Sequence, residues 1–379
     1  MAGNKSLGDA KNAKKDEFYT QLCDIEAELK HYTRFFKGKT VLCNCDDPYE
    51  SNFFYYFASR FNDLGLKKLI ATCYDGSPVA YTQLDLFGAE WEATRVSLPR
   101  SESPNRRSGT LAASSKRPRH ERHAYKIVIT EVGDENGDGA VDIADVEYLI
   151  KNRKNVLTRL KGNGDFRSPE CVELLKEADV VVTNPPFSLF REYVAQLVQY
   201  DKKFLIIGNM NEAHYKEIFS FIKENKIWLG YGNGDMSFQV PQSYEERETR
   251  FWIDETGQKW RSLGNACWFT NLDVKKRHEE YVFVRKYNPE DYPHYANFDA
   301  IDVGRRENIP GDWPGLMGVP DTFLAIYNPD QFELVGLGSG DLAKEIGVKK
   351  NFRGRTDIAL TINGKPKCPY SRIIIRRKR

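Results

Sequence analysis

One segment of this chain constrains its fold more than any other, because it joins a strand to a helix through a rigid turn. Residues 178–183, Ala-Asp-Val-Val-Val-Thr, are a short apolar run that predicts a buried parallel strand. Residues 188–198 carry apolar side chains at helical spacing. The turn between them is Asn184-Pro185-Pro186-Phe187. Open α/β sheets bind ligands at the carboxyl ends of their strands, so the segment predicts an α/β fold with a functional turn at that edge.

The chemistry of this turn suits methyl transfer to an exocyclic amine. Such an amine is a poor nucleophile, since its lone pair is delocalised into the ring. The side-chain carbonyl of Asn184 and the backbone carbonyl of Pro185 can each accept one amine hydrogen, which makes the nitrogen more nucleophilic. Pro185 and Pro186 fix φ and remove competing N–H donors, and the Phe187 ring can stack on an extruded base. A proline-stiffened connection with a core phenylalanine is the alternative, but the strand–turn–helix context favours the functional interpretation.

The 379-residue chain divides into regions of different composition. Residues 1–15 are polar, and we expect them to be disordered. Residues 16–230 alternate strand and helix patterns, including a helix over 51–61 with Ser51 as its N-cap, and predict a doubly wound parallel sheet. Within them, residues 97–123 are rich in Ser, Pro, Arg and Lys and predict a disordered basic insertion. Residues 231–379 contain short β-like segments and a basic tail, which indicates a partly separate C-terminal region.

Charge and cysteine content narrow the class of protein. The net charge is only +2, so any nucleic-acid surface must be a local patch. The seven cysteines are irregularly spaced, which favours a reducing compartment. Cys43 and Cys45 are too close together for an ordinary zinc knuckle. The sequence shows neither a signal peptide nor a long apolar segment, so we expect a cytoplasmic protein.

Four segments lie in the order that an S-adenosylmethionine-dependent adenine methyltransferase needs: residues 16–20, 43–48, 162–168 and 180–197. Together they resemble the EcoRI-type family of adenine-specific DNA methyltransferases. The resemblance covers residues 16 to about 284 well and the remaining tail less clearly. The donor loops come first and the recognition region last, which is the arrangement of the gamma group.

The resemblance implies a Rossmann-like S-adenosylmethionine-dependent methyltransferase core with a C-terminal DNA-recognition region. It further implies base flipping and donor binding without a metal. The donor contacts that it implies are Asp16, Phe18, Tyr19, Thr20, Asn44, Asp46, Asp47, Asp165 and Phe166. Asp75, which follows the second predicted strand, is a ribose-binding candidate because of its place at a strand end.

The first donor loop departs from the usual pattern. Most methyltransferases have a Gly-x-Gly turn there, whereas this chain has Cys43-Asn44-Cys45-Asp46-Asp47-Pro48. S-adenosylmethionine carries no phosphate, so close approach of the backbone to a pyrophosphate is not required. Asp46 or Asp47 can pair with the donor's ammonium or ribose hydroxyls, or one of them can cap the following helix. Residues 336–340, Gly-Leu-Gly-Ser-Gly, are interpreted as a turn in the recognition region, because too little chain follows them to complete a donor-binding half.

Residues 134–145 fit the twelve-residue pattern of a calcium loop. Gly139 would permit the sharp turn, and the oxygen ligands would be Asp134, Asn136, Asp138, the carbonyl of Ala140, Asp142 and Asp145. The loop resembles that of dockerin modules, which end in Asp where an EF-hand has Glu. A metal-free acidic turn that caps the following helix is the competing interpretation. A bound calcium ion would be structural, since amine methylation needs no metal.

Basic residues in the C-terminal region are candidates for contact with DNA phosphates: Lys349, Lys350, Arg353 and Arg355. Phe238, Trp268 and Phe269 are either neighbours of the flipped base or core residues. We therefore predict an enzyme that methylates N6 of a flipped adenine in double-stranded DNA, alongside a cognate restriction endonuclease. An RNA base-amine methyltransferase, for example for ribosomal RNA, and a non-catalytic DNA-binding protein with this fold are the alternatives.

Overall fold

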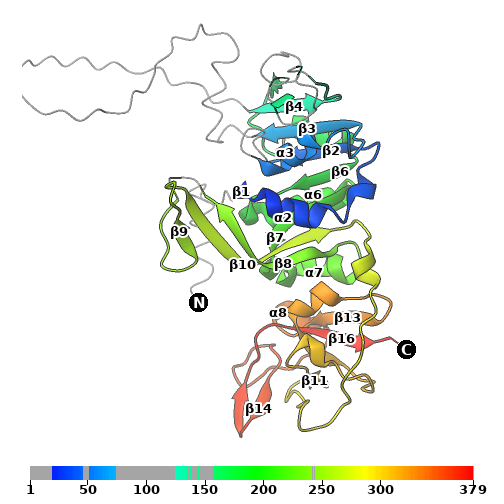
Figure 1. Ribbon diagram of the computed structural model, residues 1–379. Coiled ribbons are helices and arrows are strands. Elements are labelled where there is room, and N and C mark those ends of the chain that lie inside the picture. The colour runs from blue at the N-terminus through cyan, green and yellow to red at the C-terminus, as the bar shows by residue number, and fades with distance from the viewer. Residues whose placement is uncertain are drawn as a thin grey trace, which may run out of the picture.

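The computed structural model describes residues 19–45, 51–73, 124–134, 137, 144–145, 148, 157–240, 242 and 244–378. Two sheets lie one above the other in Figure 1, with the larger sheet formed by the first two thirds of the chain. Within the described ranges, no helix is long and apolar enough to cross a membrane. The predicted disordered terminus, 1–15, and the predicted insertion, 97–123, lie outside them.

The larger sheet has a parallel centre and antiparallel edges. Its strands follow the order β1-β8-β10-β7-β6-β2-β3-β4-β5, with β9 paired to β10. The parallel centre consists of β7 (Lys203–Asn209), β6 (Val180–Thr183), β2 (Thr40–Asn44) and β3 (Lys68–Cys73). One antiparallel edge consists of β4 (Tyr125–Ile129) and β5 (Leu157–Arg159). The other consists of β10 (Lys259–Thr270), β8 (Trp228–Gln239), β9 (Phe251–Ile253) and β1 (Tyr19–Thr20).

Helices cover both faces of the parallel centre, which is why its strands are apolar along their length. Alternate residues of β2 belong to different cores: Val41 packs on one side of the sheet and Leu42 on the other. The first face is covered by α2 (Leu22–Leu29) and α3 (Asn52–Ser59). The second is covered by α5 (Pro169–Glu177), α6 (Phe190–Gln199) and α7 (Lys216–Lys223). The predicted N-cap is confirmed, since the Ser51 hydroxyl accepts from the backbone N–H groups of Phe53 and Phe54 at 3.2 and 3.4 Å.

The smaller sheet has the order β11-β12-β16-β13. Its strands are β11 (Ile301–Asp302), β12 (Met317–Pro320), β16 (Arg372–Arg377) and β13 (Phe332–Leu337). Phe219 of α7 and Met317 of β12 belong to one continuous hydrophobic core, so the two sheets share their interior. The short helix α8 (Gly340–Glu345) packs on β13, and the hairpin of β14 (Leu360–Ile362) and β15 (Lys365–Lys367) forms a separate two-stranded sheet.

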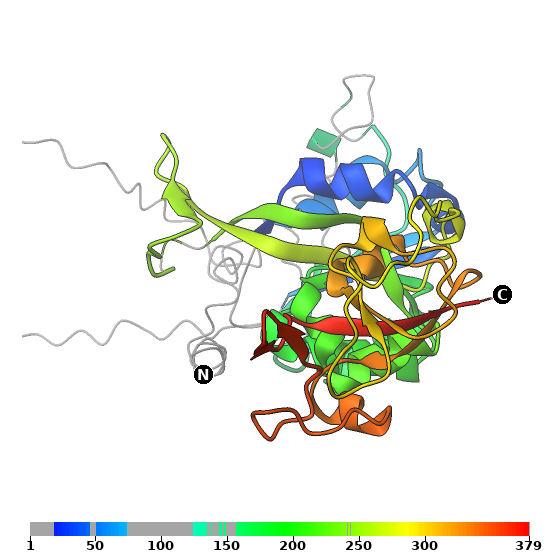
Figure 2. The same ribbon diagram turned by 90° about the horizontal axis from the view of Figure 1, so that it is seen from below.

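The hairpin of β8 and β10 continues beyond the sheet as an arm. Asn209, the last residue of β7, pairs with Ala266, whereas residues 259–263 of β10 pair only with β8 and β9. At the usual rise per residue, the arm therefore extends roughly 20 Å past the carboxyl end of β7. Figures 1 and 2 both show it projecting from the body.

The prediction of an α/β doubly wound core is confirmed, with two differences in its extent. The sheet is mixed rather than wholly parallel, because β4 and β5 are antiparallel to their neighbours. The boundary placed at residue 230 falls inside β8, so the β8–β10 hairpin belongs to the larger sheet. The role of residues 231–379 in DNA recognition stays a prediction.

Candidate active site

The carboxyl ends of β2 and β6 form the point at which the chain changes face. These neighbouring parallel strands lead to helices on opposite sides of the sheet, α3 after β2 and α6 after β6. Such a point, where neighbouring connections diverge to opposite faces, is the usual ligand site of open α/β sheets. Asn44 ends β2, and Asn184 follows β6 directly.

The Asn-Pro-Pro-Phe turn lies at this point, directly after the carboxyl end of β6, as the sequence predicts. Asn184 is half-buried, Pro185 is buried, and Phe187 begins the short 3-10 helix η4 (Phe187–Leu189). The Phe187 ring is half-buried against the core beneath α2 and α3. The hydroxyl of Thr183 donates to the backbone carbonyl of Asn44, which ties the turn to the neighbouring strand.

Thr20 of the predicted donor segment contacts the turn. The amide nitrogen of Asn184 donates to Thr20 Oγ1 at 3.3 Å, and Asn52 Nδ2 donates to the Thr20 carbonyl at 2.7 Å. Thr20 in turn pairs with Phe238 in the outer half of β8. Thr20 is therefore held between the arm and the Asn-Pro-Pro-Phe turn.

Tyr193 of α6 contacts two further residues predicted to bind S-adenosylmethionine, Asn44 and Phe166. Its hydroxyl donates to Asn44 Oδ1, and its ring meets that of Phe166 edge-on at 5.0 Å. Gln196, one turn later, donates to the Phe166 carbonyl at 3.2 Å. Sequence reasoning missed Tyr193, because a tyrosine among apolar residues at helical spacing carries no signal of a site. The Phe166 ring is itself only 4% exposed, so its contact with a donor adenine stays a prediction.

Asp165 lies in the loop before α5, at the same edge of the sheet. Arg167 pairs with it at 2.6 Å and also with Glu192 at 2.6 Å. The hydrogen bonds from Arg167 lower the pKa of Asp165 below its ordinary value, although partial burial opposes this. The side chain is therefore a carboxylate at neutral pH and can accept hydrogen bonds from a ligand.

The first donor loop begins with an unusual backbone conformation. Cys45, directly after β2, has φ of 66°, in the left-handed region that normally favours glycine. The chain thus makes, without a glycine, a sharp turn where most methyltransferases have Gly-x-Gly. The remaining predicted donor residues lie outside the described residues: Asp16, Phe18, Asp46, Asp47 and Asp75.

The described donor candidates fit S-adenosylmethionine in their chemistry. Thr20 offers a hydroxyl, Asn44 an amide and Asp165 a carboxylate, all at the carboxyl edge of the sheet. The donor presents an ammonium, ribose hydroxyls and an adenine amine, each of which needs a polar partner of this kind. The aromatic residues named for the base do not fit that role: Phe238, Trp268 and Phe269 are 0%, 1% and 0% exposed and pack in the core.

Most of the calcium-loop pattern lies outside the described residues, including Asn136, Asp138, Ala140 and Asp142. Of the two remaining ligands, Asp145 is buried, and Asp134 Oδ1 accepts from the Gly137 N–H at 2.7 Å. The part of the chain that the structure describes contains no group of three or more His, Cys, Asp or Glu residues able to hold a metal. Calcium binding therefore stays a prediction.

The four cations predicted to contact DNA lie in one exposed loop after α8. Lys349, Lys350, Arg353 and Arg355 are all exposed, and the Arg353 guanidinium lies over the exposed ring of Phe352 at 5.1 Å. The loop follows α8, which packs on β13 of the smaller sheet.

Known proteins resemble this chain over its whole length. The family described as "Adenine-specific methyltransferase EcoRI" matches residues 6–378. Type II methyltransferase M.EcoRI of Escherichia coli is 44% identical over 382 residues, which cover 100% of this chain and 98% of that protein. Type II methyltransferases M.MgeORF184P of Mycoplasma genitalium and M.MpnI of Mycoplasma pneumoniae are each 34% identical over 375 residues, covering 97% of this chain and 98% and 97% of those proteins. No solved structure shows significant similarity to the chain.

Proposed function

Since this chain belongs to the EcoRI family of adenine-specific methyltransferases, we propose that it methylates the N6 amine of a flipped adenine in double-stranded DNA, with Asn184 at the reaction centre. Family membership supports the reaction class. The hydrogen bond between Asn184 and Thr20 carries the assignment of the residues.

That hydrogen bond supports one orientation of the Asn184 amide toward the base. The amide has a donor nitrogen and an acceptor oxygen. Thr20 engages the nitrogen, so the carbonyl oxygen is the end that can accept from the N6 amine. An amine that donates to Asn184 Oδ1 and to the Pro185 carbonyl is pulled toward a tetrahedral geometry, and its lone pair becomes available for attack.

The two prolines and Phe187 position the base. Pro185 is buried and Pro186 has φ of −56°, so the turn presents its carbonyls without adding N–H donors. The Phe187 ring is anchored on one side by the core and half-exposed on the other. A flipped adenine can stack on that side, as bases do on aromatic rings in flipping enzymes.

Thr20, Asn44 and Asp165 would hold S-adenosylmethionine, which supplies an electrophilic methyl group on a sulfonium. Thr20 belongs to this set and also accepts a hydrogen bond from Asn184, so the donor and acceptor sites would adjoin. Such positioning, with exclusion of water beneath the arm, is expected to supply most of the acceleration.

The exposed loop that carries Lys349, Lys350, Arg353 and Arg355 would contact DNA phosphates. The relatives are named Type II methyltransferases. By analogy, methylation by this chain would protect DNA from a cognate restriction endonuclease.

Transfer of labelled methyl to unmethylated genomic DNA tests the proposal. The wild type should place label in N6-methyladenine, and Asn184→Ala should lose roughly a hundredfold or more of the single-turnover rate, as for loss of a precisely placed polar group in other active sites. Asn308→Ala, a half-buried asparagine in the 3-10 helix η7 (Arg306–Asn308), is the matched control and should retain activity. Label in structured RNA but not in DNA would overturn the proposal in favour of an RNA enzyme. Failure of the folded protein to bind the donor would favour a DNA-binding protein without activity.

A further inference from the structure

The β14–β15 hairpin is a short ribbon that pairs with neither the larger nor the smaller sheet. Its register pairs Leu360 with Lys367, Thr361 with Pro366, and Ile362 with Lys365. Every residue of the two strands except Leu360 is exposed, and Ile362 is 42% exposed. A lone two-stranded hairpin is marginally stable in water, so a sequence that builds one on the surface suggests a use for it.

The hairpin is nevertheless rigidly built. Its turn residues Asn363 and Gly364 have φ of 50° and 73°, as a tight type I′ turn requires. At its root, Leu360 is only 4% exposed, and Asn297 forms hydrogen bonds with the backbone of the residues just before the hairpin. Asn297 Oδ1 accepts from the Ala359 N–H at 2.8 Å, and its Nδ2 donates to the Asp357 carbonyl at 2.9 Å. These contacts anchor the root of the hairpin to the body of the protein.

The hairpin and the loop before it are strongly basic. Residues 349–367 contain six lysine or arginine residues and one aspartate, Asp357. The β8–β10 arm, the other projecting hairpin, differs in charge: residues 244–261 contain four lysine or arginine residues and five acidic ones. Of the two projections, the β14–β15 hairpin is therefore the one suited to a polyanion.

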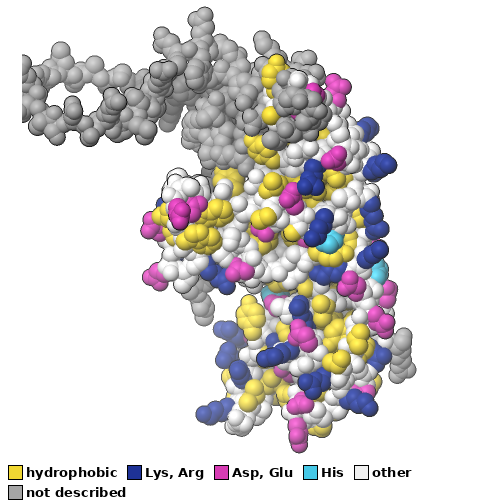
Figure 3. All heavy atoms as spheres, viewed as in Figure 1, with side chains coloured by type: hydrophobic (Ala, Val, Ile, Leu, Met, Phe, Trp, Pro, Cys, Tyr) yellow, Lys and Arg dark blue, Asp and Glu magenta, His cyan; other side chains and the backbone are white. Residues whose placement is uncertain are grey.

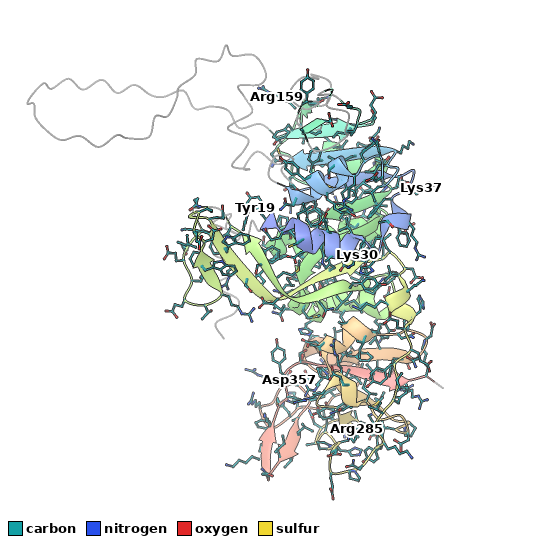
Figure 4. The ribbon with its side chains drawn as sticks, viewed as in Figure 1. Tyr19, Lys30, Lys37, Arg159, Arg285 and Asp357 are labelled. Atoms are coloured by element: carbon teal, nitrogen blue, oxygen red, sulfur yellow. The ribbon has the colours of Figure 1, made fainter. Side chains whose placement is uncertain are left out.

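The hairpin also lies on the side of the molecule where the site opens. The chain leaving it contacts η5 (Met210–His214), which directly follows β7: Ser371 Oγ lies 3.1 Å from His214 Nε2, and Tyr370 OH lies 3.5 Å from Asn211 Oδ1. In Figure 4, Asp357 and Tyr19 are on one side of the molecule and Lys37 is on the other. Figure 3 shows basic side chains along the lower margin of that side, with a hollow between this margin and the arm.

We propose that the β14–β15 hairpin enters the major groove of the substrate duplex beside the flipped adenine and reads its sequence, an inference that rests on the proposed function. A two-stranded ribbon fits a groove about 12 Å wide and about 8.5 Å deep, and three residues per strand reach about 10 Å. Asn363 and Lys365 at the tip are side chains of the types that recognise adenine and guanine edges. The loop before the hairpin holds the flanking phosphates.

The first test compares two double variants of equal charge loss. Lys365→Ala with Lys367→Ala removes the hairpin's cations, and Lys30→Ala with Lys37→Ala removes two exposed lysines elsewhere on the surface. The probe is a fluorescent mixed-sequence duplex of about 30 base pairs, which accommodates several turns of the groove. We expect the hairpin variant to bind roughly tenfold more weakly, with a salt slope reduced by about 1 to 2, and the control to match the wild type.

The second test concerns readout rather than affinity. Asn363→Gly preserves the positive φ of the turn and removes the amide. Sequencing of modified sites on unmethylated genomic DNA should show relaxed specificity at one or more positions of the recognition site, with the salt slope unchanged. An unaltered site pattern in both hairpin variants would overturn base reading, and duplex affinity equal to that of the control would overturn DNA contact altogether. A wild type that does not methylate DNA adenine would instead refute the proposed function.

Discussion

Asn184 and Thr20 are 164 positions apart in the sequence and are joined by a hydrogen bond of 3.3 Å. The bond links the turn assigned to the adenine with the strand assigned to the methyl donor. Under the proposed function, binding of the donor beside Thr20 and orientation of the Asn184 amide would thereby be coupled.

The first prediction separates this coupling from simple packing. Thr20→Val keeps the shape of the side chain and removes the acceptor oxygen, so the Asn184 amide is free to rotate. We expect the methyl-transfer rate to fall roughly tenfold to a hundredfold, with a smaller effect on donor affinity. Thr20→Ser retains the oxygen and should restore most of the rate in single-turnover experiments. Equal losses in both variants would contradict the role of the hydroxyl.

The second prediction concerns the charge at Asp165. Arg167 lowers the pKa of Asp165 in the folded protein. The carboxylate therefore stays charged at neutral pH and loses its charge only as the pH falls into the acid range. Donor affinity measured by calorimetry should therefore be constant between about pH 5.5 and about pH 7, where the donor's amine is also charged. Asp165→Asn should weaken it by roughly tenfold, the effect of one charge-assisted hydrogen bond. Glu173→Gln on the exposed face of α5 is the control. Unchanged affinity in Asp165→Asn would exclude a donor contact.

The third prediction concerns a buried carboxyl group that the sequence does not reveal. Glu212 in η5 is 7% exposed, and loss of solvent raises its pKa to about 7, with Arg191 opposing the shift. Since the folded state holds this proton more tightly than the unfolded state, stability is greatest below the unfolded pKa and falls as the pH rises toward about 7.

Urea unfolding checks this sign. Between about pH 5.5 and about pH 7.5, the free energy of unfolding of the wild type should fall by roughly 1 to 2 kcal/mol more than that of Glu212→Gln, which cannot ionise. Parallel pH profiles of the two proteins would show that Glu212 does not titrate in this window.

The fourth prediction concerns the calcium-loop pattern. Calcium at about 1 mM, a concentration that saturates weak sites, should raise the unfolding temperature of the wild type relative to a chelator. A variant with Asp134→Ala and Asp138→Ala should show no such shift. Methyl transfer should persist in the chelator, since the proposed chemistry uses no metal. An identical shift in both proteins would assign the effect to another site or to ionic strength.

Local patterns in the sequence predict the elements around the Asn-Pro-Pro-Phe turn well. Residues 178–183 are apolar because both faces of β6 are covered, and Ser51 caps α3 because its hydroxyl can reach the first N–H groups. The Asn184–Thr20 contact is not predictable in the same way, since it depends on the pairing of β1 with β8, two strands that are far apart in the sequence. The antiparallel direction of β4 also has no local signal.

Some signals were present but ambiguous. Asn363-Gly364 is a strong hairpin signal, yet its flanks lack alternating apolar residues because both strands are exposed. Aromatic spacing was equally ambiguous at Trp268 and Phe269, since the same pattern serves a core or a base pocket. The boundary predicted at residue 230 falls where β8 changes from continuous burial to mixed burial while remaining one strand.

The shared interior of the two sheets limits how this protein can change its target. Enzymes whose recognition module has its own core can acquire a new specificity by exchanging the whole module. Here such an exchange would expose Met317, Phe332 and their partners on α7, so the larger sheet would lose part of its core. Sequence differences among relatives should therefore accumulate in short surface hairpins and loops. Recombinant proteins that combine the larger sheet of one relative with the smaller sheet of another should be rare.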